Sequence, residues 1–429
     1  MPTTFYIQTS GCSASQADSE QMAGLLQQAG FTLVDNLEDA YVVIINPAID
    51  LGIDLVKQLE MFQQQQQNKI VILSGCLPSY DPKKLKLYSV IGTNQIHHVV
   101  EVVEEALNNN PVQSLNHDEL PPLNSPKIRQ NPMVEILPIS RGYSGDCTFC
   151  KTRPSLSQFK SYQPTEIISA AQKALREGVK EIWLHSQDAF GYGSDLGTDL
   201  PALLGQLAVL PGEFKIKIGP GNLEQLIKIK DQLVKIYQHP KLFKFLHLPL
   251  QTGSDAVLKQ MKKRYTVKEF NEALDKFKQA IPSLNVMTDI TVGYPTERDQ
   301  EFWDTLETVR RNSFDSINIS LFRPRPKTPA ARLPELPEEV VKRRFKVLTD
   351  IFNNISTLQN EKWFNWEGEI IIDEQGKEPG QWVGRNDAYK PVIVEGNFKL
   401  GEIVKVKVVK AEMLALRGKV ISDKVTVYG

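Results

Sequence analysis

Two hydrophobic patterns divide the chain, and together they constrain its fold more than any other feature. From residue 4 to about residue 322, apolar runs of four to seven residues alternate with longer segments whose apolar positions recur at helical spacing. That alternation is typical of α/β domains with parallel sheets. A long helix is expected over Glu338–Glu361. Residues 367–428 then hold five short strands, separated mostly by glycines, as in a small OB-like β-barrel.

A polar, proline-rich stretch over residues 108–133 interrupts the α/β part, and we interpret it as a linker. Residues 1–107 are expected to form a doubly wound parallel-sheet domain, with strands at Thr4–Gln8, Ala40–Asn46 and Lys69–Ser74. Residues 134–362 are expected to form a (βα)6 partial TIM barrel with a terminal helix. Its strands are expected at Val134–Ile139, Glu181–His185, Lys215–Ile218, Phe245–Leu250, Val286–Val292 and Ser316–Leu321. Periodicity leaves an open sheet as the alternative to this barrel. Residues 363–429 are expected to form the β-barrel domain.

Length and charge bound the function. The 429 residues are too many for one ordinary core. Fifty basic and 51 acidic residues leave a net charge of −1, which excludes nucleic-acid binding by bulk positive charge but not by a local basic face. No apolar run approaches the roughly 18 residues that span a bilayer. The N-terminus also lacks the regions of a signal peptide, so we expect a cytoplasmic protein without membrane contact.

Cys147 and Cys150 form a Cys-x-x-Cys pair in the segment SRGYSGDCTFCKTR, directly after an expected strand. This spacing allows two thiolates to bind one metal ion or iron–sulfur cluster. Two alternatives stay open: the thiols are simply buried, or they form a thioredoxin-like redox pair. With four cysteines in the whole chain, a disulfide scaffold is not expected in a reducing compartment.

Cys12 and Cys76 each follow a glycine at the end of an expected strand, in the segments TSGC and LSGC. A third strand ends at Asn46-Pro47-Ala48. Because ligands of parallel α/β sheets bind beyond the carboxyl ends of the strands, we expect both thiols to point into one crevice. Coincidental packing of the two thiols is the alternative.

Several long segments carry a resemblance to a known family: GCSASQADSE, EIWLHSQDAFGYGSDLGTDLP, FLHLPLQTGSDAVLKQMKKRYT, TDITVGYPTE, RPRPKTPAARLPELPEEVV and WVGRNDAYKPV. In type and order they resemble the methylthiotransferases, a branch of the radical SAM enzymes, over essentially the whole chain. The last two look most like the archaeal and eukaryotic branch, which modifies threonylcarbamoyladenosine in tRNA. The resemblance implies an auxiliary 4Fe–4S cluster in the N-terminal domain and a second 4Fe–4S cluster that binds S-adenosylmethionine (SAM) in the barrel. It also implies a C-terminal TRAM domain that holds tRNA.

The sequence departs from the family's cysteine pattern at two positions. Cys12 and Cys76 match the first and third cysteines of the N-terminal domain, but Ala48 stands at the second. The radical SAM motif Cys-x-x-x-Cys-x-x-Cys begins here with Tyr143, followed by Cys147 and Cys150. A phenol ionises at a pKa of about 10, against about 8.5 for a thiol, and its oxygen is a harder ligand. We therefore expect weaker cluster assembly with an altered potential, or no cluster.

By the same resemblance, polar residues and glycines after the strand ends would bind SAM: Ser186, Gln187, Asp188, Gln251, Asp289 and Gly293. Such residues suit a small polar ligand at the mouth of a barrel. The family's Met-Asn-Pro segment after the third barrel strand is replaced by Gly219-Pro220-Gly221-Asn222, which puts contacts from this strand in doubt. His185 and His247 fall within strand-end segments, and we interpret both as core histidines.

Local basic residues in the C-terminal domain are candidates for RNA contacts. Residues 383–424 carry nine Lys or Arg against five Asp or Glu, a net of +4. The candidates for the RNA backbone are Arg385, Lys390, Lys405, Lys407 and Arg417, with Trp382 or Tyr389 stacking on an unpaired base. Lys262, Lys263 and Arg264, and Arg323, Arg325 and Lys327, would extend this track. A solvated barrel face is the alternative.

The resemblance implies a tRNA methylthiotransferase that adds a methylthio group to N6-threonylcarbamoyladenosine beside the anticodon by radical SAM chemistry. Its partners would be tRNA, an electron donor and a sulfur donor. The alternative is a tRNA-binding relative with impaired or absent catalysis, which the replacements at Ala48 and Tyr143 favour. Altered clusters with different chemistry are a third reading. In either enzyme reading, the cofactors carry the difficult chemistry and the protein positions them.

Overall fold

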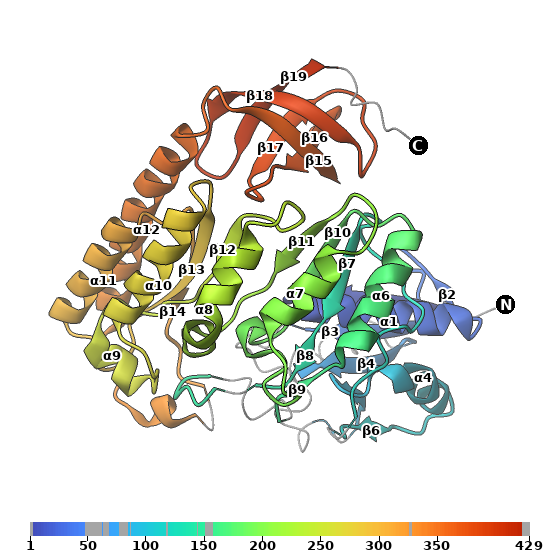
Figure 1. Ribbon diagram of the computed structural model, residues 1–429. Coiled ribbons are helices and arrows are strands. Elements are labelled where there is room, and N and C mark those ends of the chain that lie inside the picture. The colour runs from blue at the N-terminus through green and yellow to red at the C-terminus, as the bar shows by residue number, and fades with distance from the viewer. Residues whose placement is uncertain are drawn as a thin grey trace.

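The computed structural model describes residues 3–47, 62, 68–76, 85, 87–116, 119–143, 145–150, 158–325 and 328–422. A parallel barrel occupies the centre, the N-terminal domain lies beside it, and a closed β-barrel sits over one of its ends (Figure 1). These are the three units expected from the sequence, in the expected order. Among the described residues, none of the helices combines the length and the apolar character that crossing a membrane requires.

The N-terminal domain is built on a six-stranded parallel sheet with the order β2-β1-β3-β4-β5-β6. The strands are β1 (Thr4–Thr9), β2 (Thr32–Leu33), β3 (Val42–Asn46), β4 (Ile70–Gly75), β5 (Ser89–Gly92) and β6 (Gln113–Ser114). The short strands β2, β5 and β6 carry too few residues for a periodic signal, so the sequence did not predict them. β6 lies within the stretch interpreted as a linker.

Helices cover this sheet because its strands are apolar on both faces. On one face, α1 (Ser13–Gln28), the 3-10 turn η2 (Ile96–His98) and α4 (Val99–Leu107) bury residues such as Met22 and Val103 against it. Phe62 and Leu85 pack on the other face. The strand order reverses between β1 and β3, which makes the carboxyl edge there the natural ligand site of such a sheet.

Six parallel strands form the partial barrel: β7 (Val134–Pro138), β10 (Glu181–His185), β11 (Lys215–Ile218), β12 (Phe245–His247), β13 (Asn285–Val292) and β14 (Ser316–Leu321). They fall into two three-stranded sheets that a single bridge between Ile216 and Leu242 joins. A small hairpin, β8 (Ser140–Arg141) with β9 (Lys160–Ser161), follows β7. The expected six-strand barrel is therefore confirmed, with a weak seam between its third and fourth strands.

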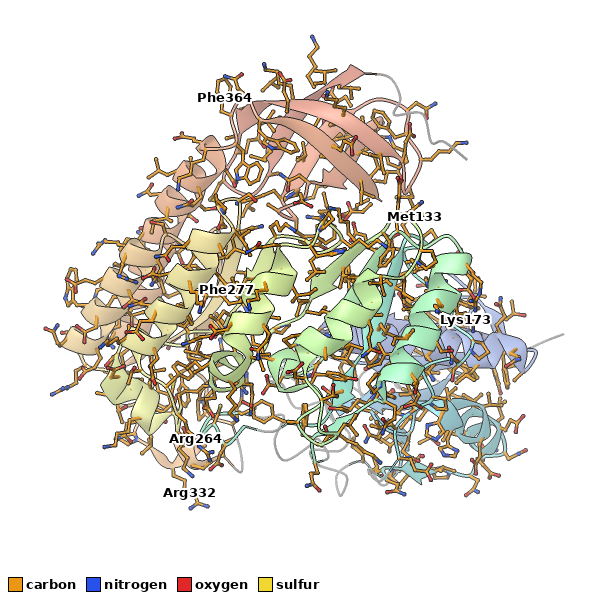
Figure 2. The ribbon with its side chains drawn as sticks, in the orientation of Figure 1. Met133, Lys173, Arg264, Phe277, Arg332 and Phe364 are labelled. Carbon is orange, nitrogen blue, oxygen red and sulfur yellow. The ribbon has the colours of Figure 1, made fainter. Side chains whose placement is uncertain are left out.

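The barrel helices are α6 (Pro164–Arg176), α7 (Leu200–Ala208), α8 (Leu223–Tyr237), α9 (Asp255–Gln260), α10 (Val267–Ala280) and α11 (Asp299–Asn312), with 3-10 turns η3 (Ala189–Gly191) and η4 (Pro329–Arg332). Their apolar faces pack on the strands in one large core. Phe277 of α10 is fully buried there, edge-on to Tyr237 of α8 (Figure 2). On the free edge of the sheet, Ala17 of α1 packs against Val134 and Ile136 of β7, which fixes the N-terminal domain to the barrel.

The long helix α12 (Glu338–Glu361) runs along the barrel and leads into the closed C-terminal β-barrel (Figure 1). Its strands are β15 (Glu367–Gln375), β16 (Gln381–Arg385), β17 (Pro391–Glu395), β18 (Ile403–Ala411) and β19 (Leu416–Ser422), in the order β15-β16-β17-β19-β18. Asn285, at the start of β13, donates from Nδ2 to the carbonyl of Ala388 at 2.9 Å. The C-terminal barrel therefore covers the amino ends of the parallel strands. Arg264 and Arg332 lie at the opposite end (Figure 2).

Candidate active site

The segment that follows β7 connects the two groups of cysteines. Residues 140–142 line a small cavity together with Cys76 and Gln187. The next residue, Tyr143, contacts Cys147. The crevice of the N-terminal sheet and the cysteine loop of the barrel therefore meet at the carboxyl end of β7.

Cys12 and Cys76 follow β1 and β4 at the carboxyl edge of the N-terminal sheet. Cys12 is exposed at the start of α1, and Cys76 is partly buried. The pKa of the Cys76 thiol is raised to about 12, chiefly by burial and also by the charges of Cys12 and Asp18, against the opposing effect of Arg141. Cys76 is therefore protonated at neutral pH, and a metal that binds it must displace the proton.

Gly75 provides the sharp turn before Cys76. Its φ is +93°, and a Cβ at this position would clash with Oδ1 of Asn46. Asn46 ends β3 and donates from Nδ2 to the carbonyl of Ser15 at 2.9 Å and to Ser19 Oγ at 3.0 Å. These contacts hold α1 against the strand ends. Ala48, the altered family position two residues further on, lies outside the described residues.

His185, at the end of β10, lines the same cavity as Cys76. Its Nδ1 lies 2.7 Å from Ser13 Oγ, whereas its Nε2 is buried and has no hydrogen-bond partner in the described part of the chain. The pKa of His185 is lowered to about 4, chiefly by burial and also by the positive charges of Arg141 and Lys217. The ring is therefore neutral at pH 7. A core histidine would have hydrogen-bond partners for both nitrogens, but among the described residues only Nδ1 has one.

Arg141 is a residue of this site that the sequence motifs did not indicate; only its place two residues before Tyr143 hints at it. Its guanidinium pairs with Asp18 of α1 at 2.7 Å and donates to the carbonyl of Thr93 at 2.8 Å. Burial lowers its pKa, but the charges of Asp18 and Tyr162 and the hydrogen bonds to both together outweigh this and leave the pKa raised. A permanent cation therefore joins the N-terminal domain to the barrel beside Cys76.

The loop that carries Cys147 and Cys150 is anchored at its middle residue. Thr148 donates from its backbone N–H to the carbonyl of Met261 at 3.2 Å, and its hydroxyl lies 2.8 Å from that of Tyr294. Cys150 donates from its N–H to the carbonyl of Cys147 at 3.3 Å, which closes a turn. Both thiols are thereby held on the same short turn.

Tyr143 occupies the first position of the cysteine motif, and its phenol oxygen lies 3.1 Å from Cys147 Sγ. Burial raises the pKa of Tyr143 far above its usual value, and negative charge on Cys147 and Cys150 raises it further. Lys263 also hydrogen-bonds Cys147. Burial lowers the pKa of Lys263, but the charge and hydrogen bond of Cys147, with the charges of Tyr265 and Glu224, together leave the pKa raised. The first donor of the motif is thus a neutral phenol, and a cation lies beside the second.

Asn222 links this loop to the neighbouring strand ends. It donates from its N–H and from Nδ2 to the carboxylate of Asp188, at 2.8 and 3.0 Å. Its Oδ1 accepts from Lys263 Nζ at 3.4 Å, and it also hydrogen-bonds Tyr143. The segment that replaces the family's Met-Asn-Pro therefore connects Asp188 to the cysteine loop.

The residues predicted to bind SAM divide into buried and accessible groups. Ser186 and Asp188 are fully buried, and Ser186 Oγ lies 2.5 Å from Ser140 Oγ. These side chains therefore position loops. Gln187 lines the Cys76 cavity. The N–H of Gly293 donates to Glu297 Oε2 at 3.0 Å, which closes the turn after β13.

Gln251 follows β12, and Asp289 lies in the neighbouring strand β13, near the mouth of the barrel. Gln251 has a φ of +73°, and its Oε1 accepts from Thr291 Oγ1 at 2.9 Å. Both carboxylate oxygens of Asp289 lie 3.2 Å from Nε2 of His247. His247 thus has a charged partner inside the barrel, in agreement with its interpretation as a satisfied interior histidine.

On the C-terminal barrel, Lys405 and Lys407 project from the outer face of β18, alternating with buried valines. Lys407 pairs with Glu367 at 2.9 Å, and Arg417 pairs with Glu412 at 2.7 Å. Lys407 also lies directly opposite Lys419 of β19. Like charges opposite one another destabilise a sheet, and the ion pair of Lys407 with Glu367 offsets this repulsion here.

Two further RNA candidates also have partners within the protein, and their buried positions correct the sequence-based expectation. Lys390 is only 4% exposed and pairs with Asp315 at 2.8 Å. Arg385 pairs with Asp373 at 2.8 Å, in a partly buried position. Tyr389 is also unsuited to stacking on a base, because it packs between the domains. Its ring centroid lies 4.9 Å from that of Phe243. Sequence spacing alone could not reveal that these side chains face the parallel barrel.

The comparison with known families follows the division into three units. The radical SAM superfamily matches residues 137–309, the uncharacterized protein family UPF0004 matches residues 4–91, and the TRAM domain matches residues 367–421. Among solved structures, a radical SAM methyltransferase, TsrM from Kitasatospora setae, is similar in fold. Its TM-score is 0.55 at 10% identity, over 77% of this chain and 75% of that one.

Curated relatives match nearly the whole chain. The threonylcarbamoyladenosine tRNA methylthiotransferase of Homo sapiens is 35% identical over 97% of this chain and 74% of its own length. A relative from Pyrococcus abyssi, with the same name marked as probable, is 35% identical over 93% of this chain and 96% of its own. The radical SAM family implies a 4Fe–4S cluster and SAM as cofactors. The chain belongs to the threonylcarbamoyladenosine tRNA methylthiotransferase family of radical SAM enzymes.

Proposed function

We propose that this protein adds a methylthio group to N6-threonylcarbamoyladenosine of a tRNA. The observation that carries the proposal is the short path between the two cysteine sites. Residues 140–142 line the cavity of Cys76, and Tyr143 contacts Cys147. A base bound at the barrel mouth would lie between a site suited to activating SAM and a second site suited to delivering sulfur. Membership of the family over 97% of the chain supports the same reaction.

The N-terminal site offers a donor set that fits an iron–sulfur cluster despite the loss of one cysteine. Cys12 and Cys76 supply two thiols, and the unpartnered Nε2 of His185 lines the cavity with Cys76. Imidazole replaces thiolate in some iron–sulfur centres. The hydrogen bond between Ser13 Oγ and Nδ1 of His185 would fix the ring, as outer partners of metal-bound histidines do. We propose His185 as the third ligand where the family has a cysteine.

The barrel site provides thiols for two of the three protein ligands that such a cluster needs. Cys147 and Cys150 supply thiols, and the ammonium of Lys263 beside Cys147 favours the charged, ligating form of a sulfur atom. Tyr143 would have to lose a phenolic proton that its surroundings retain. We propose that this cluster assembles with two thiolates and the Tyr143 phenolate, and that its occupancy is lower than a three-thiolate site would allow.

A cluster at the barrel mouth, with SAM bound to it, would supply the reductive cleavage of SAM and the methyl group. The chain's own residues would bind and orient the cofactors and the substrate. Asp188 and Asn222 hold the loops after β10 and β11 together. Gln251 and Asp289 present polar atoms inside the barrel. An electron donor, a sulfur donor and a cytoplasmic location remain predictions.

The substrate would reach this mouth from the C-terminal barrel. Lys405, Lys407 and Arg417 lie on β18 and β19 of a TRAM domain, where they would bind the tRNA backbone by charge. Because this domain covers the amino ends of the parallel strands, the tRNA would have to extend along the outside of the barrel to bring its anticodon loop to the opposite end.

The test is anaerobic reconstitution of the full chain with iron and sulfide, followed by reaction with SAM, dithionite and tRNA that carries threonylcarbamoyladenosine. Iron at both sites, up to about eight per chain when both are filled, deoxyadenosine release and a methylthiolated nucleoside by mass spectrometry are the expected results. No SAM cleavage, with tRNA binding that weakens steeply with salt, would instead establish a tRNA-binding relative without this chemistry.

The ligand role of His185 has its own test. In a Cys147→Ala/Cys150→Ala background, only the N-terminal cluster can form, and pulsed EPR of the reduced cluster should detect a directly bound nitrogen. His185→Gln should remove that coupling and lower the iron content. His247→Gln, at the other barrel histidine, should leave both unchanged. A nitrogen signal that persists in His185→Gln would exclude His185 as the ligand.

A further inference from the structure

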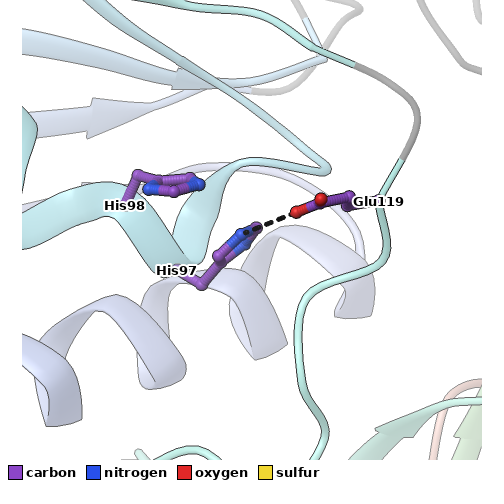
Figure 3. Close-up of side chains that lie close together, drawn as sticks. All are labelled: His97, His98 and Glu119. Carbon is purple, nitrogen blue, oxygen red and sulfur yellow. Dashed lines mark ion pairs between the residues drawn. The ribbon is translucent and has the colours of Figure 1, made fainter.

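Two histidines and a glutamate gather beside the cysteine crevice, from segments to which no role has been given. His97 and His98 belong to η2, the turn that follows β5 and leads into α4. Glu119 comes from the extended segment between β6 and the barrel. Figure 3 shows the imidazole of His97 directed towards the Glu119 carboxylate, with the His98 ring beside it.

The three side chains are close enough for one metal ion. One ligand atom from each lies within 4.8 Å of the others, and His97 Nε2 lies 3.9 Å from Glu119 Oε2. Bonds of about 2.0–2.1 Å in a tetrahedron would place these atoms about 3.3 Å apart. The carboxylate of Glu119 is 71% exposed and the His98 side chain 40%, so rotations of exposed side chains can close the difference.

The hydrogen bonding of His97 also indicates an absent partner. Its Nδ1 is buried and accepts or donates no hydrogen bond among the described residues. Its Nε2 is too far from Glu119 for a hydrogen bond. A buried polar group without a partner costs free energy, and each such group needs an explanation. A metal ion bound through Nδ1 would supply one.

The second imidazole has a neighbour that could hold its ring in place. On the other ring, Nδ1 of His98 lies 3.3 Å from Glu101 of α4, a carboxylate placed to orient the ring as outer partners do.

We propose that His97, His98 and Glu119 form a binding site for a divalent transition-metal ion, with one coordination position open to water. Two imidazoles and one carboxylate are a ligand set that Zn²⁺ uses in open sites. The occupied site would connect the segment around Glu119 to the carboxyl edge of the N-terminal sheet. Thr93, which accepts from Arg141, lies at the same edge, so the metal would lie close to the Cys76 crevice.

The test is calorimetric titration of the iron-free full chain with Zn²⁺, compared with variants, because the cysteines also bind this ion. Wild type should bind one equivalent more than His97→Ala. Glu119→Gln, an exposed position that cannot disturb the core, should weaken the same equivalent by at least about 100-fold, since outer-partner losses alone cost 10–100-fold. His239→Ala, at a histidine far along the chain, should retain it.

Cobalt identifies the ligands of that equivalent. The difference between the Co²⁺ spectra of wild type and Glu119→Gln should show weak visible bands without the near-ultraviolet band of a cobalt–thiolate bond. Circular dichroism should show equal folding of the two proteins. Equal stoichiometry and affinity in wild type and Glu119→Gln would overturn the site, as would a thiolate band in the difference spectrum.

Discussion

The phenol oxygen of Tyr143 lies 3.1 Å from Cys147 Sγ, at the position where the family's radical SAM motif begins with a cysteine. Gly145 leaves room for the ring, and Thr148 anchors the turn that carries Cys147. What changes is the donor: a buried phenol whose pKa is raised well above the ordinary value. Several expected outcomes follow from this and from the interfaces between the domains.

Tyr143→Cys should restore a three-thiolate site and raise the iron bound at the barrel. The reason is that a thiol loses its proton to iron more readily than this phenol does. Iron and sulfide analysis after anaerobic reconstitution measures the change, together with visible absorption. Tyr143→Phe, which removes the donor and keeps the ring, should bind less iron than wild type. If Phe and Tyr bind iron equally, Tyr143 is not a ligand.

Arg141→Met should lower the free energy of unfolding by about 3–5 kcal/mol. The substitution leaves Asp18, which is only 2% exposed, without its cation. The double variant Asp18→Asn/Arg141→Met removes both charges and should recover most of the loss. Urea unfolding followed by tryptophan fluorescence measures all three proteins. A double variant no more stable than Arg141→Met would show that packing, and not the ion pair, determines the cost.

Glu181→Gln should change how stability depends on pH. The pKa of Glu181 is raised from 4.5 to about 7, chiefly by burial and also by Asp373, against the hydrogen bond from Trp183 and the charges of Arg385 and Lys217. Between pH 4.5 and about 7 the folded state keeps a proton that the unfolded chain has lost. The wild type therefore loses stability as the pH rises over this range. The pKa of Lys217 is lowered to about 8, chiefly by burial, so its titration lies mostly above this window.

The glutamine keeps an acceptor for the indole N–H of Trp183, which bonds Glu181 at 2.8 Å. Unfolding free energies should therefore be similar for the two proteins near pH 4.5. The variant should be more stable by on the order of 3 kcal/mol at pH 7.5. A difference that stays constant over this range would rule out ionisation of Glu181 as its cause.

Lys405→Gln/Lys419→Gln should weaken tRNA binding and reduce its dependence on salt. Each lysine that no longer neutralises a phosphate should reduce the slope of log affinity against log salt by about one. Lys399→Gln, a single exposed lysine in the loop before β18, is the control and should keep the wild-type slope. Binding is measured by fluorescence anisotropy over a range of salt concentrations. An unchanged slope in the double variant would place the RNA on another face.

Local patterns in the sequence predicted much of the fold. The strands Glu181–His185, Lys215–Ile218 and Ser316–Leu321 begin and end where the structure has them, as does helix Glu338–Glu361. Hydrophobic periodicity reflects which face of an element is buried, and that information lies within a few neighbouring residues. The same holds for Cys147 and Cys150, whose spacing alone indicates a shared ligand.

The tertiary structure decided which side chains pair with one another, and local sequence patterns carry no information about these pairs. Lys263 and Lys390 look alike in the sequence as basic residues for RNA, yet one lies beside Cys147 and the other is buried against Asp315. Ser13 and His185 meet although 172 positions separate them. The sequence therefore determined the elements, the domain order and the cysteine pairs. Which charges are buried, and which side chains face the cysteines, depends on how the three domains pack, because burial and pairing are set by residues distant in the chain.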